Sequence, residues 1–68
     1  MTENKTAKEM FEELGWVQET NNKSFIVYER GFRTIVFLRY EKAIVPLCYI
    51  NVRLLKAINK QCEELGWL

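Results

Sequence analysis

Apolar residues recur at helical spacing in two segments, one near each end of the chain. The first segment carries Ala7, Met10, Phe11 and Leu14, and the second carries Leu54, Leu55, Ile58, Cys62 and Leu65. Spacings of three and four residues place such side chains on one side of a helix, where they are buried together. The pattern therefore predicts two amphipathic helices, over residues 7–14 and 52–65.

Both predicted helices begin at residues that cap helix N-termini. Thr6 and Glu9 form a Thr-x-x-Glu capping box, in which each side chain bonds the backbone N–H of the other residue. Asn51 precedes the second helix and is a good N-cap by itself.

The two helices also end alike, because the pentapeptide Glu-Glu-Leu-Gly-Trp occurs at 12–16 and again at 63–67. Each glycine favours the left-handed conformation that ends a helix, and the following tryptophan then packs back on the helix. We expect Trp16 to contact Phe11 and Trp67 to contact Cys62. We interpret the two copies as helix ends rather than as an internal duplication.

Between the helices, residues 16–50 are rich in β-branched and aromatic types and are divided by turn-forming residues. We predict strands over residues 16–19, 24–30, 32–40 and 43–50. The connections are too short for crossovers, so neighbouring strands must run antiparallel. Pro46 cannot donate to a β-ladder, which predicts that the fourth strand lies at an edge or carries a bulge.

These elements predict an α+β fold in two layers. The order is helix, four-stranded antiparallel meander, helix, and both helices are expected on one sheet face because one face needs a cover. At 68 residues the chain has room for a single domain, which we take as residues 1–68.

The third predicted strand alternates between two sets of side chains. Phe32, Thr34, Val36, Leu38 and Tyr40 point one way, and Arg33, Ile35, Phe37 and Arg39 point the other. We assign the first set to the helix-covered core and the second to the open face, where Tyr28 or Tyr49 would extend it. The open face would then present an apolar stripe flanked by arginines, which we take as the candidate binding site.

The acidic helix ends form a second candidate surface. A helix C-terminus carries partial negative charge, so glutamates are unfavourable there. One interpretation is that they only keep a small protein soluble; the other is that acidic tips beside exposed tryptophan edges form a recognition surface. The residues of that surface are Glu12, Glu13, Trp16, Glu63, Glu64 and Trp67.

Composition excludes several chemistries. The chain has no histidine, which removes the usual catalytic base and the commonest transition-metal ligand. Two cysteines far apart cannot complete a zinc site, and no glycine-rich phosphate-binding motif is present. We therefore predict that the protein is not an enzyme and uses no metal or cofactor.

Cysteine usage and hydropathy bear on where the protein works. Cys48 and Cys62 are isolated in apolar surroundings, which favours small buried thiols in a reducing cytosol, although a bridge between them stays open. The polar N-terminus shows no signal peptide, and the apolar stretch at 43–50 is too short for a membrane helix. We expect a cytoplasmic protein with no membrane partner.

Binding is the function that these exclusions leave, and two kinds of partner remain open. Exposed Ile35 and Phe37 would mark a protein-contact site, and a second copy of the chain is one candidate partner. The alternative is nucleic acid bound by Arg33, Phe37 and Arg39 on the sheet face. The net charge is only +1, but seven basic residues lie between 23 and 56 against two acidic ones.

Two segments of the chain resemble a group of small uncharacterised proteins encoded by phages and prophages of Gram-positive bacteria. They are Thr-Ala-Lys-Glu-Met-Phe-Glu-Glu-Leu-Gly-Trp at 6–16 and Leu-Leu-Lys-Ala-Ile-Asn-Lys-Gln-Cys-Glu-Glu-Leu-Gly-Trp at 54–67. The resemblance covers both helices, and the strand-rich middle only in pattern. It implies a compact accessory protein acting by binding in a bacterial host cytoplasm, and it implies no catalytic residues.

Overall fold

The two helices begin at the caps that the sequence predicts. The structure, a computed structural model, describes residues 5–68; residues 1–4, on which the expectation about a signal peptide partly rests, lie outside this part. In α1 (Ala7–Glu13), the Glu9 N–H donates to the Thr6 hydroxyl and the Thr6 N–H donates to the Glu9 carboxylate. In α2 (Val52–Glu64), Asn51 accepts from the Leu54 N–H at 2.9 Å.

Both helices end in the same hydrogen-bonded motif, as the repeated pentapeptide predicts. The Trp16 N–H donates to the Phe11 carbonyl at 2.9 Å, and the Trp67 N–H donates to the Cys62 carbonyl at 2.9 Å. The preceding glycines have φ of +91° and +79°, the left-handed conformation of a Schellman ending. The Trp16 ring also packs edge-on against Phe11, with ring centroids 6.2 Å apart.

Four antiparallel strands follow each other as a meander, in the sheet order β1-β2-β3-β4. Their bounds are β1 (Val17–Asn21), β2 (Phe25–Arg30), β3 (Arg33–Leu38) and β4 (Ala43–Leu47). β4 lies at an edge, as Pro46 predicts, and the bulge is in β1 instead, between Gln18 and Thr20.

β3 and β4 are shorter than the sequence pattern suggested. β3 ends at Leu38 because the chain turns over residues 39–42, where Lys42 adopts a φ of 53°. β4 ends at Leu47 rather than at residue 50, directly after Pro46.

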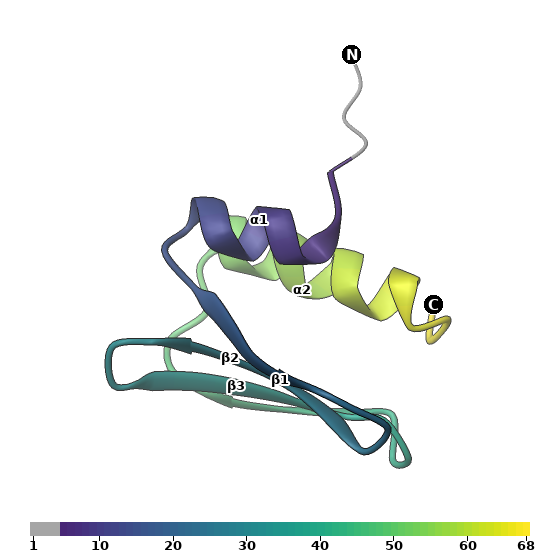
Figure 1. The fold of residues 1–68 in the computed structure, drawn as a ribbon. Helices are drawn as coiled ribbons and strands as arrows, with labels where there is room; N and C mark the ends of the chain where they lie inside the picture. The colour runs from purple at the N-terminus through teal and green to yellow at the C-terminus, as the bar shows by residue number, and fades with distance from the viewer. Residues whose placement is uncertain (1–4) are drawn as a thin grey trace.

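Both helices cover one face of the sheet, and the other face has no cover in the described part of the chain (Figure 1). The helices run antiparallel, so the start of α1 meets the end of α2. At that point the Ala7 N–H donates to the Glu64 carboxylate at 2.8 Å. The α+β fold in two layers, with both helices on one face, is as predicted.

An aromatic cluster fills the space between helices and sheet. The rings of Phe11 and Tyr28 stack with centroids 3.9 Å apart, and Phe37 stands edge-on to both at 6.2 and 6.1 Å. Such stacked and edge-to-face pairs add stability beyond the area they bury.

The two faces of β3 are the reverse of the sequence expectation. Ile35 and Phe37, which we expected on the open face, are 0% exposed beneath the helices. Ile35 pairs with Tyr28, and Phe37 pairs with Ile26, and both partners are buried as well. The bulkier side of the sheet is therefore the covered one.

The residues of the third predicted strand that we expected in the core do not lie there. Phe32 and Tyr40 lie in turns outside β3, and they are 107% and 78% exposed. The remaining members, Thr34, Val36 and Leu38, are half-buried on the uncovered face. Counting the two turn aromatics as core residues made the wrong side of the strand look heavier.

Candidate functional site

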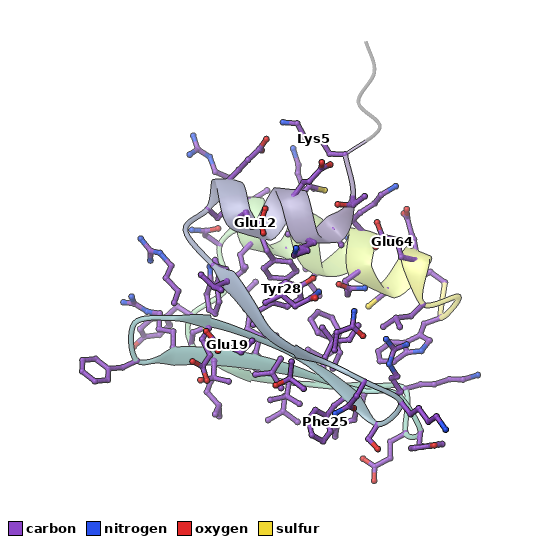
Figure 2. All side chains as sticks on the ribbon, in the orientation of Figure 1. Lys5, Glu12, Glu19, Phe25, Tyr28 and Glu64 are labelled. Atoms are coloured by element: carbon purple, nitrogen blue, oxygen red, sulfur yellow. The ribbon has the colours of Figure 1, made fainter. Side chains whose placement is uncertain are left out.

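The uncovered side of the sheet is the first candidate surface, which we call the open sheet face. Strand register and burial assign to it the residues that alternate with the buried ones: Val17, Thr20, Phe25, Val27, Glu29, Thr34, Val36, Leu38, Ala43, Val45 and Leu47. One row crosses all four strands, because Val27 pairs with Thr20 and Val36, and Val36 pairs with Val45. Figure 2 shows Phe25 pointing away from the helices and Tyr28 pointing toward them.

The open sheet face is apolar and carries almost no charge. Leu47 is 62% exposed and Val45 40% exposed, and the face residues of the two central strands are half-buried by their neighbours, except the exposed Glu29. Among the residues that the register assigns to this face, Glu29 is the single charged one, and none is a lysine or arginine; Glu19, in the β1 bulge, is exposed and has no register partner. Contiguous exposed apolar surface of this kind marks interaction sites in soluble domains.

The arginines expected on this face lie elsewhere, so the expected grouping of Arg33, Phe37 and Arg39 on the open face is wrong. Arg33 begins β3 on the same side as Ile35 and Phe37, and Arg39 lies in the turn directly after β3. The Arg39 guanidinium donates to the Asn22 carbonyl at 2.6 Å and to Asn21 Oδ1 at 2.7 Å. Arg39 therefore fastens the β1–β2 turn.

The second predicted surface, at the acidic helix ends, does not form one site. Because the helices are antiparallel, its two halves lie at opposite ends of the helix layer, as the positions of Glu12 and Glu64 in Figure 2 show. Glu64 caps the first turn of α1, which explains its place at the end of α2. Trp16, expected at the surface, is 4% exposed.

The other members of that predicted surface also have local roles or none. Glu12 and Glu13 form ion pairs with Lys8 and Lys5, at 3.7 and 2.6 Å. Trp67 is half-buried against Phe37, with centroids 6.4 Å apart. Glu63 is exposed.

A cavity of about 440 Å³ lies where α1 ends, the β2–β3 hairpin turns and α2 begins. Its lining consists of three arginines, one glutamate and five other residues: Glu13, Leu14, Trp16, Arg30, Arg33, Tyr49, Asn51, Arg53 and Leu54. Of these, only Arg33, and Glu13 and Trp16 on the acidic surface, were among the predicted site residues.

A second cavity, of about 530 Å³, lies between the two helices. Its lining consists of one glutamate, two apolar residues and four basic residues: Glu13, Met10, Leu14, Lys5, Arg53, Lys56 and Lys60. Arg53 and Glu13 belong to both cavities. The excess of basic residues between 23 and 56 was the sequence signal for this side of the molecule, but only the fold brings Arg30, Arg33 and Arg53 together.

The two cysteine thiols show no sign of activation. Burial raises the pKa of the Cys62 thiol, and it raises the pKa of Cys48, an effect that the charge of Arg33 partly offsets. Both cysteines are free thiols. A raised pKa keeps a thiol protonated near neutral pH, and the protonated form is a poor nucleophile.

Comparison of the chain with protein-family models, with curated proteins and with solved structures finds no match. Neither helix in the described part of the chain has the length and apolar character needed to cross a membrane. Within residues 5–68, no three residues of the types His, Cys, Asp and Glu are grouped so that they could hold a metal ion.

Proposed function

We propose that this protein acts by binding rather than by catalysis, and that the open sheet face is its protein-contact surface. The observation that carries the proposal is the row Thr20, Val27, Val36 and Val45 across the sheet, apolar in β2, β3 and β4, on a face that neither helix of the described residues covers. Burial of this row in an interface would stabilise the complex by about 25 cal/mol for each Å² of apolar surface removed from water.

The partner that this face fits best is a second copy of the chain. Two such faces pack as a sandwich about 10 Å apart, and the result is four layers with helices outside. With Glu29 as the single charge among the residues that the register assigns to it, the face brings few like charges together when it meets its own copy. A short chain also has a small core, so an interface adds a large share of its buried area.

The dimension of the face sets the expected strength of the dimer. Four strands about 4.8 Å apart, with a rise of about 3.3 Å per residue, give a flat footprint of roughly 350 Å². A standard interface buries about 800 Å² of accessible surface on each partner. The dimer is therefore expected to be weak, with a dissociation constant in the micromolar range or above.

The setting proposed for this activity is the cytoplasm of a bacterial host, as an accessory protein of a phage or prophage. The support is the resemblance of residues 6–16 and 54–67 to small proteins of that origin. In that setting a larger host or phage protein is the rival occupant of the open sheet face.

Sedimentation equilibrium over micromolar to millimolar concentrations tests self-association. We expect a concentration-dependent dimer, and we expect Val45→Lys to abolish it because the substitution places a charge on the open sheet face. Val52→Lys is the matched control: Val52 is 69% exposed at the start of α2, away from this face, and the variant should dimerise like the parent chain.

Either of two results would overturn the proposal of a dimer. One is a chain that stays monomeric at millimolar concentration, which would leave the face to a different protein. The other is a dimer that both lysine variants weaken equally, since the contact would then lie elsewhere.

A further inference from the structure

Three arginines from different elements surround the cavity of about 440 Å³ at the end of the helix layer. Arg30 is the last residue of β2, Arg33 is the first residue of β3, and Arg53 is the second residue of α2. The β2–β3 hairpin brings the first two together, since Arg30 pairs with Arg33 in the register.

The three positive charges have no acidic partner within the described residues. The ion pairs found in residues 5–68 join Lys5 to Glu13 and Lys8 to Glu12, and none includes these arginines. Glu13 is the only carboxylate in the cavity lining, and Lys5 lies 2.6 Å from it. The unpaired positive charges around this cavity repel each other. An anion bound between them would attract each arginine and so offset this repulsion.

All three arginine side chains are exposed, and one of them lies against the end of α1. A Cβ built on Gly15 would lie 2.9 Å from Nε of Arg30, so the Arg30 side chain packs directly over the end of α1. Arg53 lies in the first turn of α2, which contains no acidic residue and is the positive end of the helix dipole. A cation there is unfavourable for the helix alone, so helix stability does not explain it.

We propose that this cavity binds a phosphate monoester group, with Arg30, Arg33 and Arg53 as its ligands. Guanidinium groups bind phosphate oxygens through paired, charge-assisted hydrogen bonds, and several arginines match a doubly charged group better than a singly charged diester. The volume is in the range of small-molecule sites and exceeds that of phosphate alone. Tyr49 and Asn51 are exposed and line the same cavity, where they could contact the group that carries the phosphate.

This site lies on the helix side of the sheet, whereas the proposed dimer contact is the open sheet face. The two proposals therefore stand or fall separately. Lys56 and Lys60 line the neighbouring cavity between the helices, and they suggest a rival ligand, the phosphodiester backbone of a nucleic acid.

Titration of the ¹⁵N-labelled chain with inorganic phosphate and with adenosine monophosphate, followed by NMR, tests the site. We expect saturable shifts of the amides around residues 14–16, 30–33 and 49–54, with dissociation constants in the millimolar range or tighter. Arg33→Gln should weaken binding about tenfold, because it removes paired charge-assisted bonds. Arg33→Lys, which keeps the charge without the planar fork, should lie in between.

Lys23→Gln is the control for net charge, since Lys23 is exposed in the β1–β2 turn and lines neither of these cavities. It should bind as the parent chain does, and the amide spectrum of each variant shows directly whether it is folded. Equal weakening by Lys23→Gln and Arg33→Gln, or no saturable shift at all, would overturn the proposal.

A pair of short single-stranded oligonucleotides separates the two sources of phosphate. One carries a 5′-phosphate and the other ends in a hydroxyl. Preference for the phosphorylated end supports a monoester site. Equal, salt-sensitive binding of both that depends on Lys56 and Lys60 would assign this side of the molecule to a nucleic-acid backbone, and the monoester site would be wrong.

Discussion

At the scale of single residues, the core contains one polar network. The Gln18 side-chain amide donates to the Tyr28 hydroxyl at 3.1 Å, and this hydroxyl donates to Gln61 Oε1 at 2.6 Å. Gln61 is buried although it is polar. Among the described residues no buried side-chain nitrogen or oxygen lacks a hydrogen-bond partner, so the network is fully satisfied. A satisfied network of this kind favours one arrangement of the helices over others.

Removing the Tyr28 hydroxyl should be costly for its size. Tyr28→Phe leaves the Gln61 carbonyl oxygen buried without a donor, and we expect a loss of about 1–3 kcal/mol in the free energy of unfolding. The double variant, Tyr28→Phe with Gln61→Leu, should lose less stability than the sum of the two single variants, because the two residues share one hydrogen bond. Urea denaturation measures both values.

The control for this change is Tyr40→Phe. Tyr40 is exposed in a turn, and loss of its hydroxyl should change stability by less than about 0.5 kcal/mol. Strict additivity of Tyr28→Phe and Gln61→Leu would show that the hydrogen bond contributes nothing in solution.

At the scale of elements, one local device ends both helices, but its surroundings differ. Gly15 and Gly66 have similar φ angles and make the same hydrogen bonds. A Cβ on Gly66 would meet nothing within 4 Å, whereas one on Gly15 would meet the Arg30 side chain. The two sites therefore separate backbone strain from side-chain crowding.

We expect Gly66→Ala to cost about 1–2 kcal/mol, the penalty for an L-residue in the left-handed conformation. Gly15→Ala should cost about as much, because the atom in its way belongs to the far end of the exposed, flexible Arg30 side chain, which can move aside. Thermal or urea denaturation of both variants measures the two losses. A much larger loss for Gly15→Ala would contradict this and would mean that Arg30 cannot move aside.

At the scale of the whole molecule, the helices select which side of the sheet is core. Phe37 and Val36 are neighbours in β3, yet Phe37 lies in the aromatic cluster and Val36 lies on the open sheet face. The sequence placed Phe37 outside because Phe32 and Tyr40 were counted as core on the other side of the strand. In the fold Arg33 lines the cavity where α2 begins and Arg39 bonds the β1–β2 turn, while Ile35 and Phe37 between them are covered.

This arrangement predicts opposite outcomes for two adjacent alanine substitutions. Phe37→Ala should cost about 3–5 kcal/mol, as other buried phenylalanines do, which is enough to unfold much of a small domain. Val36→Ala should cost about 1 kcal/mol in the monomer, the scale of a change in strand propensity. Circular dichroism melts at low concentration, where a dimer dissociates, give both values, and the reverse order would restore the original face assignment.

The elements of this protein and their order follow from local patterns in its sequence. Capping boxes, left-handed glycines and short turns act through contacts within a few residues, so Thr6, Asn51, Gly15 and Gly66 could be interpreted without knowing the fold. The exclusion of histidine chemistry likewise needs only the composition.

Which sheet face is open and which charged residues meet depends on how the elements pack in three dimensions. Face choice depends on the summed bulk of residues paired across four strands, and alternation along one strand cannot supply this sum. Glu64 and Ala7 are 57 positions apart, and Arg33 and Arg53 come from different elements. Contacts of that kind arise from the packing of α1 and α2 on the sheet, so no local pattern in the chain encodes them.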